Sequence, residues 1–216
     1  MSGFDPSSDQ IALDDLVSID AAILSRTRIL SEQIMAHYRA YEFSDVTQAL
    51  HQFCMDDLGG FYLDIIKDRQ YTLKASCHAR RSCQTVLFWV TDALARLMSP
   101  ILSFTAQEIW DSLPGSRPHP FVFAMTELEI PKTTGRAAID WVTVQSVKTL
   151  INQAIEVARN DGIVKGSLSA EVRLYAGSDI KPVLETLGDE LRFVTITSEV
   201  YLADLSDAPA DAITGC

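Results

Sequence analysis

Residues 79–98 have the sequence ARRSCQTVLFWVTDALARLM, in which apolar side chains recur every three or four positions. The members of this apolar stripe are Val86, Val90, Ala93, Leu94 and Leu97. Such spacing is typical of an amphipathic α-helix that buries one face. Ser99-Pro100 follows, and the backbone before a proline disfavours helix. The stretch therefore predicts a core helix over residues 79–98.

Three more segments before residue 116 have the same periodicity. The first covers residues 14–43 with Ser18 as its candidate N-cap, and the second begins after Ser44 and extends through residue 66. Gly59-Gly60 interrupts the second helix, and two adjacent glycines favour a kink or a close helix–helix approach. Thr105-Ala106-Gln107-Glu108 fits a capping box that opens a short helix, which Pro114-Gly115 ends. Together they predict an antiparallel helical bundle over residues 14–115.

The second half of the chain has a different pattern. Prolines and a glycine interrupt residues 116–138, which predicts a connector containing an extended patch at residues 121–123. A helix is expected over residues 140–159, and Asn160-Asp161-Gly162 closes it. Alternation then predicts strands at 168–175, 191–197 and 200–205, with a helix at 178–187. The expected fold is mainly α, with a small α+β junction domain over residues 139–206, an N-terminal segment at 1–13 and a tail at 207–216.

Charge is distributed unevenly along the chain. Its 216 residues include 18 lysines and arginines against 29 acidic residues, a net charge of -11, which argues against a general nucleic-acid binder. Residues 64–81 are the exception, because five basic residues face two acidic ones there. A local basic patch on an acidic body can hold a polyanion, since screening confines the attraction to about 8 Å. A solvated loop between two helices is the alternative.

Several classes of function are disfavoured by what the sequence lacks. No apolar run approaches the length of a membrane span, and residues 1–10 do not resemble a signal peptide, so we expect a cytoplasmic protein. The four cysteines form no C-x2-C pair and the four histidines are scattered, which predicts no metal site. Phosphate-binding glycine loops and hydrolase motifs are also missing, so no catalytic residues are predicted.

Aromatic, guanidinium and amide side chains alternate in two stretches, FYLDIIKDRQYT at residues 61–72 and ARRSCQ at residues 79–84. Single-stranded RNA is held by this chemistry, because bases stack on rings or guanidinium planes and amides read base edges. Taken alone the signal is weak, since Phe61 and Ile65 fit a helix core and Asp68 with Arg69 could be an ordinary ion pair.

Together with SPILSFTAQEIWDSLPG at residues 99–115, these stretches closely resemble the anticodon-binding region of the bacterial isoleucyl-tRNA synthetases, which are class I aminoacyl-tRNA ligases. The likeness covers residues 3–212, and includes GDELRF at residues 188–193. Residues 117–136 diverge from the family, as do Lys148 and Lys165. The resemblance implies a helical domain that docks the anticodon stem-loop of isoleucine tRNA, followed by a small α+β junction domain.

The resemblance also implies what this piece would lack. The family's nucleotide-binding catalytic domain, its editing domain and its cysteine-rich zinc module have no counterpart in the sequence. ATP, magnesium and zinc are therefore expected for the parent enzyme and no cofactor for this piece, which would bind RNA without catalysing a reaction. Met1-Ser2 ahead of a mid-protein sequence suggests an excised piece, which we expect to be monomeric and to work with the parent's remaining domains.

The candidate residues for RNA contact are basic, aromatic and amide residues in or near these motifs. They are Lys67, Arg69, Tyr71, Lys74, Arg80, Arg81, Gln84 and Trp110. For Arg80-Arg81 the alternative is an ion-paired helix start beside Asp68, and for Trp110 it is packing in the bundle rim. Two other functions stay open: a helical protein-interaction module without RNA readout, and an independent enzyme, which the missing motifs disfavour.

Overall fold

The computed structural model describes residues 3–125, 128–132, 140–210 and 212–213. Its contacts divide the chain into two compact units, residues 1–136 and 137–216, and the division falls within the segment predicted as a connector. Each unit is considered separately below. The chain is mainly helical with one small sheet, as the sequence predicted.

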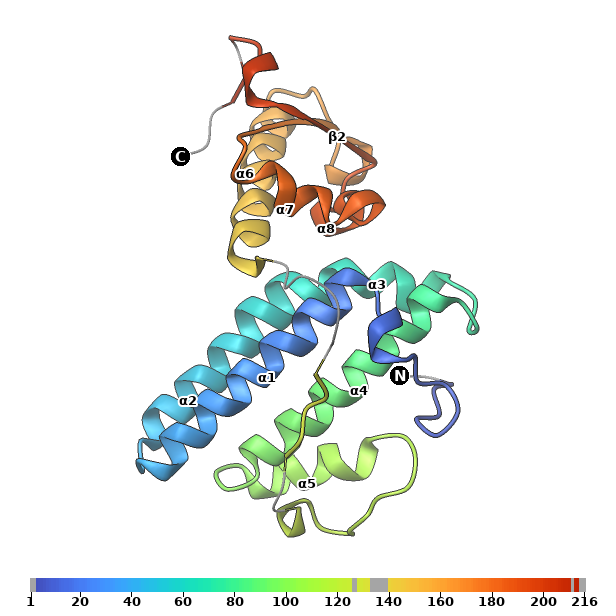
Figure 1. Ribbon diagram of the computed structural model, residues 1–216, viewed down its shortest axis with the longest axis vertical. Helices are drawn as coiled ribbons and strands as arrows, with labels where there is room; N and C mark the ends of the chain where they lie inside the picture. The colour runs from blue at the N-terminus through green and yellow to red at the C-terminus, as the bar shows by residue number, and fades with distance from the viewer. Residues whose placement is uncertain (1–2, 126–127, 133–139, 211, 214–216) are drawn as a thin grey trace. The chain divides into compact units, whose positions relative to one another are not determined.

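The first unit is a bundle in which α1 (Ser18–Arg39) packs against both α2 (Phe43–Gln52) and α4 (His78–Met98). The chain continues from α2 through the π-helical stretch η2 (Phe53–Tyr62) into α3 (Leu63–Thr72), and α5 (Ser103–Ser112) packs on α4. In Figure 1, α1 and α2 lie side by side because the chain reverses direction after residue 39. The helix predicted for residues 79–98 is thus present within one residue of its expected start.

Apolar side chains at helical spacing form the core of this bundle. On α1, Ile19, Ile23 and Ile34 have no exposed surface, and on α4 Val86 and Ala93 are equally buried. Fully burying one such aliphatic side chain contributes about 1.5–3 kcal/mol relative to leaving it exposed. Tertiary packing of these stripes therefore explains why both segments are helical.

The ends of α1 differ from the prediction for residues 14–43. Helix α1 begins at Ser18 itself, its N-cap residue is Val17, and no side chain caps it. The chain leaves the helix after Arg39 because Tyr41 takes a left-handed conformation with φ of 59°. A 3-10 turn, η1 (Leu13–Asp15), occupies the start of the predicted helix.

Gly59 and Gly60 do not bring another helix close. Both are exposed and lie within η2, where the wider π turn continues into α3 without a break. A Cβ atom on either glycine would come within 3.1 Å of a backbone carbonyl oxygen, that of Cys54 or Met55. The expected close approach was wrong, because the glycines relieve crowding inside their own helix rather than between helices.

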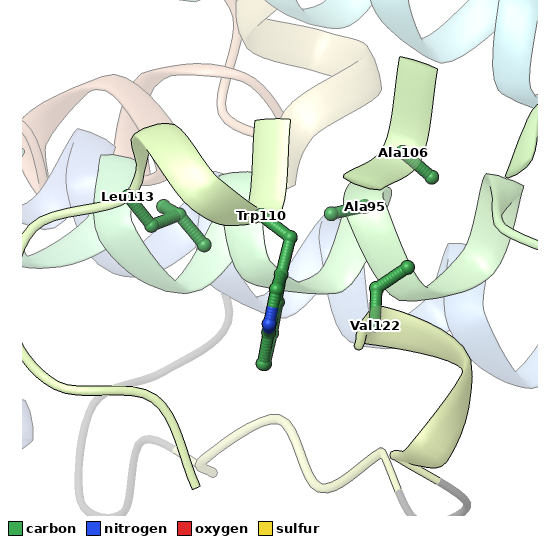
Figure 2. Close-up of a cluster of buried hydrophobic side chains, with 5 residues drawn as sticks. All are labelled: Ala95, Ala106, Trp110, Leu113 and Val122. Carbon is green, nitrogen blue, oxygen red and sulfur yellow. The ribbon is translucent and has the colours of Figure 1, made fainter. Parts of the chain in front are cut away.

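Two local predictions around α5 were also wrong. Helix α5 begins at Ser103 after the N-cap residue Leu102, so Thr105 lies inside it and the expected capping box does not form. Of residues 121–123 only Phe121 is extended, because the 3-10 turn η3 (Val122–Ala124) starts directly after it. This turn buries Val122 against Trp110 in a cluster that Figure 2 shows with Ala95, Ala106 and Leu113.

The second unit begins with α6 (Trp141–Asn160), whose N-cap Asp140 accepts a hydrogen bond from the Thr143 backbone N–H. The helix closes as expected, with Gly162 at φ of 72°. Strands β1 (Glu171–Ala176) and β2 (Glu199–Asp204) pair in parallel, with Val172 opposite Val200. The short helices α7 (Lys181–Glu185) and α8 (Leu191–Thr195) connect them.

The strand expected at residues 191–197 is helix α8 instead. Leu191, Val194 and Thr195 are buried at spacings of three and four, which is a helical pattern. The β-branched residues Val194, Thr195 and Ile196 favour a strand by composition, which misled the prediction. In the structure, Ile196 takes a left-handed conformation at φ of 57° and ends α8 before β2 begins. Among the described residues, no helix combines the length and the apolar character that crossing a bilayer requires.

Candidate nucleic-acid interface

Three of the eight residues predicted to contact RNA have buried side chains. Arg69 is 6% exposed, Trp110 is 1% exposed and Gln84 has no exposed surface. Each would have to leave the packed bundle to touch a ligand, so the structure gives them structural contacts and no surface role. The remaining five lie at or near the turn between α3 and α4.

Arg69 belongs to a polar network around the fully buried carboxylate of Asp20. Asp20 accepts hydrogen bonds from the Tyr62 hydroxyl at 2.7 Å and the Ser82 hydroxyl at 2.6 Å, and Arg69 Nη1 lies 3.6 Å from Asp20 Oδ2. Burial, and then the Asp20 charge, hold the pKa of Tyr62 well above its ordinary value. The network joins α1, η2, α3 and α4, because each element supplies one member.

Cys83 lies in contact with the same network. It accepts a hydrogen bond from Gln70 Nε2 at 2.8 Å, and burial followed by the charge of Asp20 raises the pKa of the Cys83 thiol to about 12. Because the folded state holds this proton more tightly, the resulting stability is present below the ordinary thiol pKa. It is lost as the pH rises toward about 12.

We expect Cys83 to resist alkylation in the folded chain, because the thiolate is the reactive form and little is present at about pH 8. Cys77, which is partly exposed, should react with iodoacetamide under the same conditions. Peptide mapping after timed labelling measures both sites, and labelling in urea supplies the unfolded control. Equal labelling rates at Cys83 and Cys77 before unfolding would contradict the burial.

Arg81 and Gln84 attach the N-terminal segment to the start of α4. Arg81 Nη1 donates to Gln84 Oε1 and to the Gly3 carbonyl, both at 3.0 Å, and lies 3.2 Å from an Asp9 carboxylate oxygen. The backbone N–H of Ile11 donates to the Thr85 hydroxyl. Sequence reasoning missed this role, because nothing local indicates that residues 78 positions apart meet.

Trp110 fills the cluster under α5 that Figure 2 shows. Its indole N–H donates to the His119 carbonyl at 3.1 Å. The guanidinium groups of Arg96 and Arg117 lie 5.3 and 5.5 Å from the centroid of its ring, within the range of cation–π attraction. This arrangement matches the alternative that the sequence left open, packing at the bundle rim.

Four of the remaining candidates define a surface that we call the α3–α4 turn surface: Lys67, Tyr71, Lys74 and the partly buried Arg80. Lys67 and Tyr71 are four residues apart on α3 and share one helix face, and Tyr71 is 87% exposed. Lys67 Nζ pairs with Asp64 at 2.7 Å, and that hydrogen bond, then the Asp64 charge, raises the pKa of Lys67. Both carry substantial exposed surface, so the pair leaves Lys67 accessible to solvent.

Lys74 and Arg80 lie in the turn and in the first helical turn that follows it. The Lys74 side chain is exposed, whereas Arg80 is partly buried and donates to the Leu73 carbonyl at 2.6 Å. Helix α4 starts at His78 without a side-chain cap, so the backbone N–H groups of its first turn are not used by a capping side chain. An exposed ring, two cations and a helix N-terminus in one turn can together accept a base and its phosphate.

A group that sequence reasoning did not anticipate lies at the α1–α2 turn. Atoms of His37, Glu42 and Asp45 that could bind a metal all lie within 4.8 Å of one another. His37 Nδ1 already contacts Glu42 at 2.7 Å, and Asp45 lies in the first turn of α2, where a negative charge is favourable. These two effects account for the cluster, which is partly or fully exposed.

Comparison with known proteins agrees with this helical arrangement. The family described as the anticodon-binding domain of tRNA ligase matches residues 20–174. The isoleucine–tRNA ligase of Pseudoalteromonas translucida is 45% identical over 99% of this chain, and that of Shewanella halifaxensis is 46% identical over the same share. The chain spans only 23% of the length of either relative. Since the matching segment covers more than half of the chain and all but the first two residues of the helices from α1 to α5, the chain belongs to the anticodon-binding domain family of tRNA ligases.

Proposed function

We propose that this chain recognises the anticodon stem-loop of isoleucine tRNA as one part of an isoleucine–tRNA ligase. The observation that carries the proposal is the family match over residues 20–174, a segment that contains the exposed α3–α4 turn surface. The identity to isoleucine–tRNA ligases supports the choice of tRNA.

The chemistry of the α3–α4 turn surface supports this function. Tyr71 presents an almost fully exposed ring on which an unpaired base can stack. Lys67 on the same helix face and Lys74 in the following turn add exposed positive charge, which attracts the backbone phosphates. The rest of the chain is acidic, with an overall net charge of -11, so it repels RNA elsewhere and limits binding to this turn.

Replacing Tyr71 by alanine should weaken binding of a synthetic isoleucine tRNA anticodon stem-loop by about 5- to 150-fold, which is the contribution of one stacked base. Fluorescence anisotropy with a labelled stem-loop measures the change. Tyr41 is the matched control, because it is 79% exposed and lies in the turn between α1 and α2. If Tyr71→Ala bound as tightly as Tyr41→Ala, stacking on Tyr71 would be excluded.

Lys74 is expected to contribute through charge rather than stacking. Its replacement by alanine should reduce the slope of log affinity against log salt by about 0.7, the value for one phosphate contact on a single strand. Lys165, an exposed lysine of the second unit, supplies a control of equal charge. A slope that fell equally for Lys165→Ala would show a general charge effect and not a contact in the turn.

A protein-interaction role is the second candidate function, and exposed aromatic side chains favour it. Phe121 and Phe123 stack with ring centroids 5.6 Å apart and planes 7° apart, although each is more than half exposed. Phe104 on α5 is 89% exposed. Exposed rings of this kind are typical of contact surfaces between domains. If the stem-loop did not bind while the other domains of a relative bound in trans and Phe121→Ser abolished that binding, this candidate would be favoured.

The remaining properties that we propose belong to the longer enzyme. Joining isoleucine to its tRNA would require ATP and magnesium, and a zinc module would lie outside these 216 residues. We expect this chain alone to be a monomer without catalytic activity or cofactor, and to work in the cytoplasm beside the other domains. Aminoacylation assays of the chain alone and within a full-length relative test this division.

A further inference from the structure

We infer that Arg80 serves RNA binding as a positioning residue: it fixes the C-terminal end of α3, next to Tyr71, and the turn that carries Lys74, and it does not itself contact phosphate. This inference rests on the proposed function and assigns a different role to one of the residues expected to touch RNA. It depends on how Arg80 reaches back from α4 onto the end of α3.

The end of α3 needs an external partner. Leu73 follows the last helical residue and is extended, with φ of -77° and ψ of 151°, so its carbonyl points out of the helical hydrogen-bond pattern. Arg80 Nη1 donates to this carbonyl at 2.6 Å. Hydrogen bonds from a charged donor are among the stronger ones, and a cation at a helix C-terminus is also favoured by the helix dipole. Arg80 therefore caps a helix that precedes its own.

Two hydrogen bonds hold the backbone on either side of the Lys74 side chain. On one side Arg80 fixes the preceding carbonyl, that of Leu73, and on the other the Lys74 carbonyl accepts from the Cys77 backbone N–H at 3.0 Å. The intervening residues 75 and 76 are exposed and add no buried anchor. Without the Arg80 contact, the hydrogen bond from the Cys77 N–H to the Lys74 carbonyl would have to hold the turn. The Lys74 side chain would then be less well oriented.

The buried side of the guanidinium argues against a direct phosphate contact. Arg80 Nε is buried and has no hydrogen-bond partner among the residues that the structure describes. A phosphate bound edge-on to an arginine uses Nε together with one Nη group, and here the Nε edge is closed to solvent. The open Nη1 is already committed to Leu73. A phosphate that bound edge-on through Nε would therefore require the Arg80 side chain to move.

Arg81, the neighbouring residue, supplies a matched control. Its side chain ties the N-terminal segment through Gly3 and Asp9, and it touches the turn through its backbone N–H, which donates to the Cys77 carbonyl and is kept in any Arg81 variant. The two arginines of the doublet therefore hold different segments on either side of the α4 start. Substitution at Arg81 removes the same charge and leaves the turn tied.

A double-mutant cycle with the synthetic anticodon stem-loop tests the inference. Arg80→Ala should weaken binding roughly tenfold in the wild-type chain but less than about twofold in the Lys74→Ala, Tyr71→Ala background, because positioning has no effect once its targets are gone. Arg81→Ala should have the same effect in both backgrounds. An Arg80→Ala loss of equal size in both backgrounds would identify a direct contact and overturn the inference, as would unchanged binding.

Hydrogen exchange in the free chain gives a readout that does not need RNA. Arg80→Ala should speed exchange of the Cys77 amide, which closes the turn, whereas Arg81→Ala should not. Arg80→Lys retains a donor and should restore both slow exchange and binding, which guards against a general folding defect. Unchanged exchange at Cys77 would overturn the inference. Failure of the wild-type chain to bind would instead remove the proposed function on which it rests.

Discussion

Replacing Asp20 by alanine is expected to lower the free energy of unfolding by about 3–5 kcal/mol, the cost of removing one partner from a buried ion pair. Arg69 would keep its charge in the core at 6% exposure and lose a carboxylate 3.6 Å away. The hydroxyls of Tyr62 and Ser82 would each lose an acceptor in a site without water access. A buried polar group left without its partner adds about 1–3 kcal/mol of penalty.

Urea denaturation followed by circular dichroism measures this loss, with Asp15→Ala as the control because Asp15 is exposed. Asp20→Asn retains an acceptor without the charge, so its effect should be intermediate. A loss below about 1 kcal/mol for Asp20→Ala would mean that water or a rearranged side chain satisfies Arg69. The network would then add little to the joining of α1 and α4.

The network also explains which part of the site could be predicted from the sequence. The basic and aromatic composition of residues 64–81 correctly located a surface turn, since Tyr71 and Lys74 are exposed there. It could not show that Arg69 is turned inward, because its partner Asp20 is on another helix. A polar residue at an inward position of a helix indicates a buried pair only once the packing of helices is known.

The same distinction holds for the fold. Helices α4 and α6, which have long apolar stripes, were predicted within one residue at each end. The spacing of the apolar residues within each segment is enough to show which face is buried. Short elements were not, and α8 is the clearest case. Its five residues favour a strand by composition, and packing against α6 decides otherwise. The π-helical form of η2 likewise depends on how ten residues fit between α2 and α3.

Trp110→Ala should be comparably destabilising, by about 3–5 kcal/mol, because it leaves a cavity the size of an indole ring in the cluster of Figure 2. Two further interactions would be lost with the ring: the hydrogen bond to the His119 carbonyl and the attraction to Arg96 and Arg117. Arg117 also donates to the Trp110 carbonyl at 2.7 Å, a backbone contact that the substitution leaves in place. Residues 117–122 should therefore become more mobile but stay attached to α5 through this hydrogen bond.

Trp110→Phe is a milder change, since it keeps one aromatic ring and removes the indole N–H together with the five-membered part of the ring system, at an expected cost of about 1–2 kcal/mol. Thermal unfolding of both variants measures the stability, and stem-loop binding well below the melting temperature measures the function. A buried Trp110 predicts that folded Trp110→Phe binds RNA as tightly as the wild type. Weaker binding by a fully folded Trp110→Phe variant would restore Trp110 as an RNA contact, because a residue that only packs the bundle rim cannot alter affinity at the distant α3–α4 turn while the fold is intact.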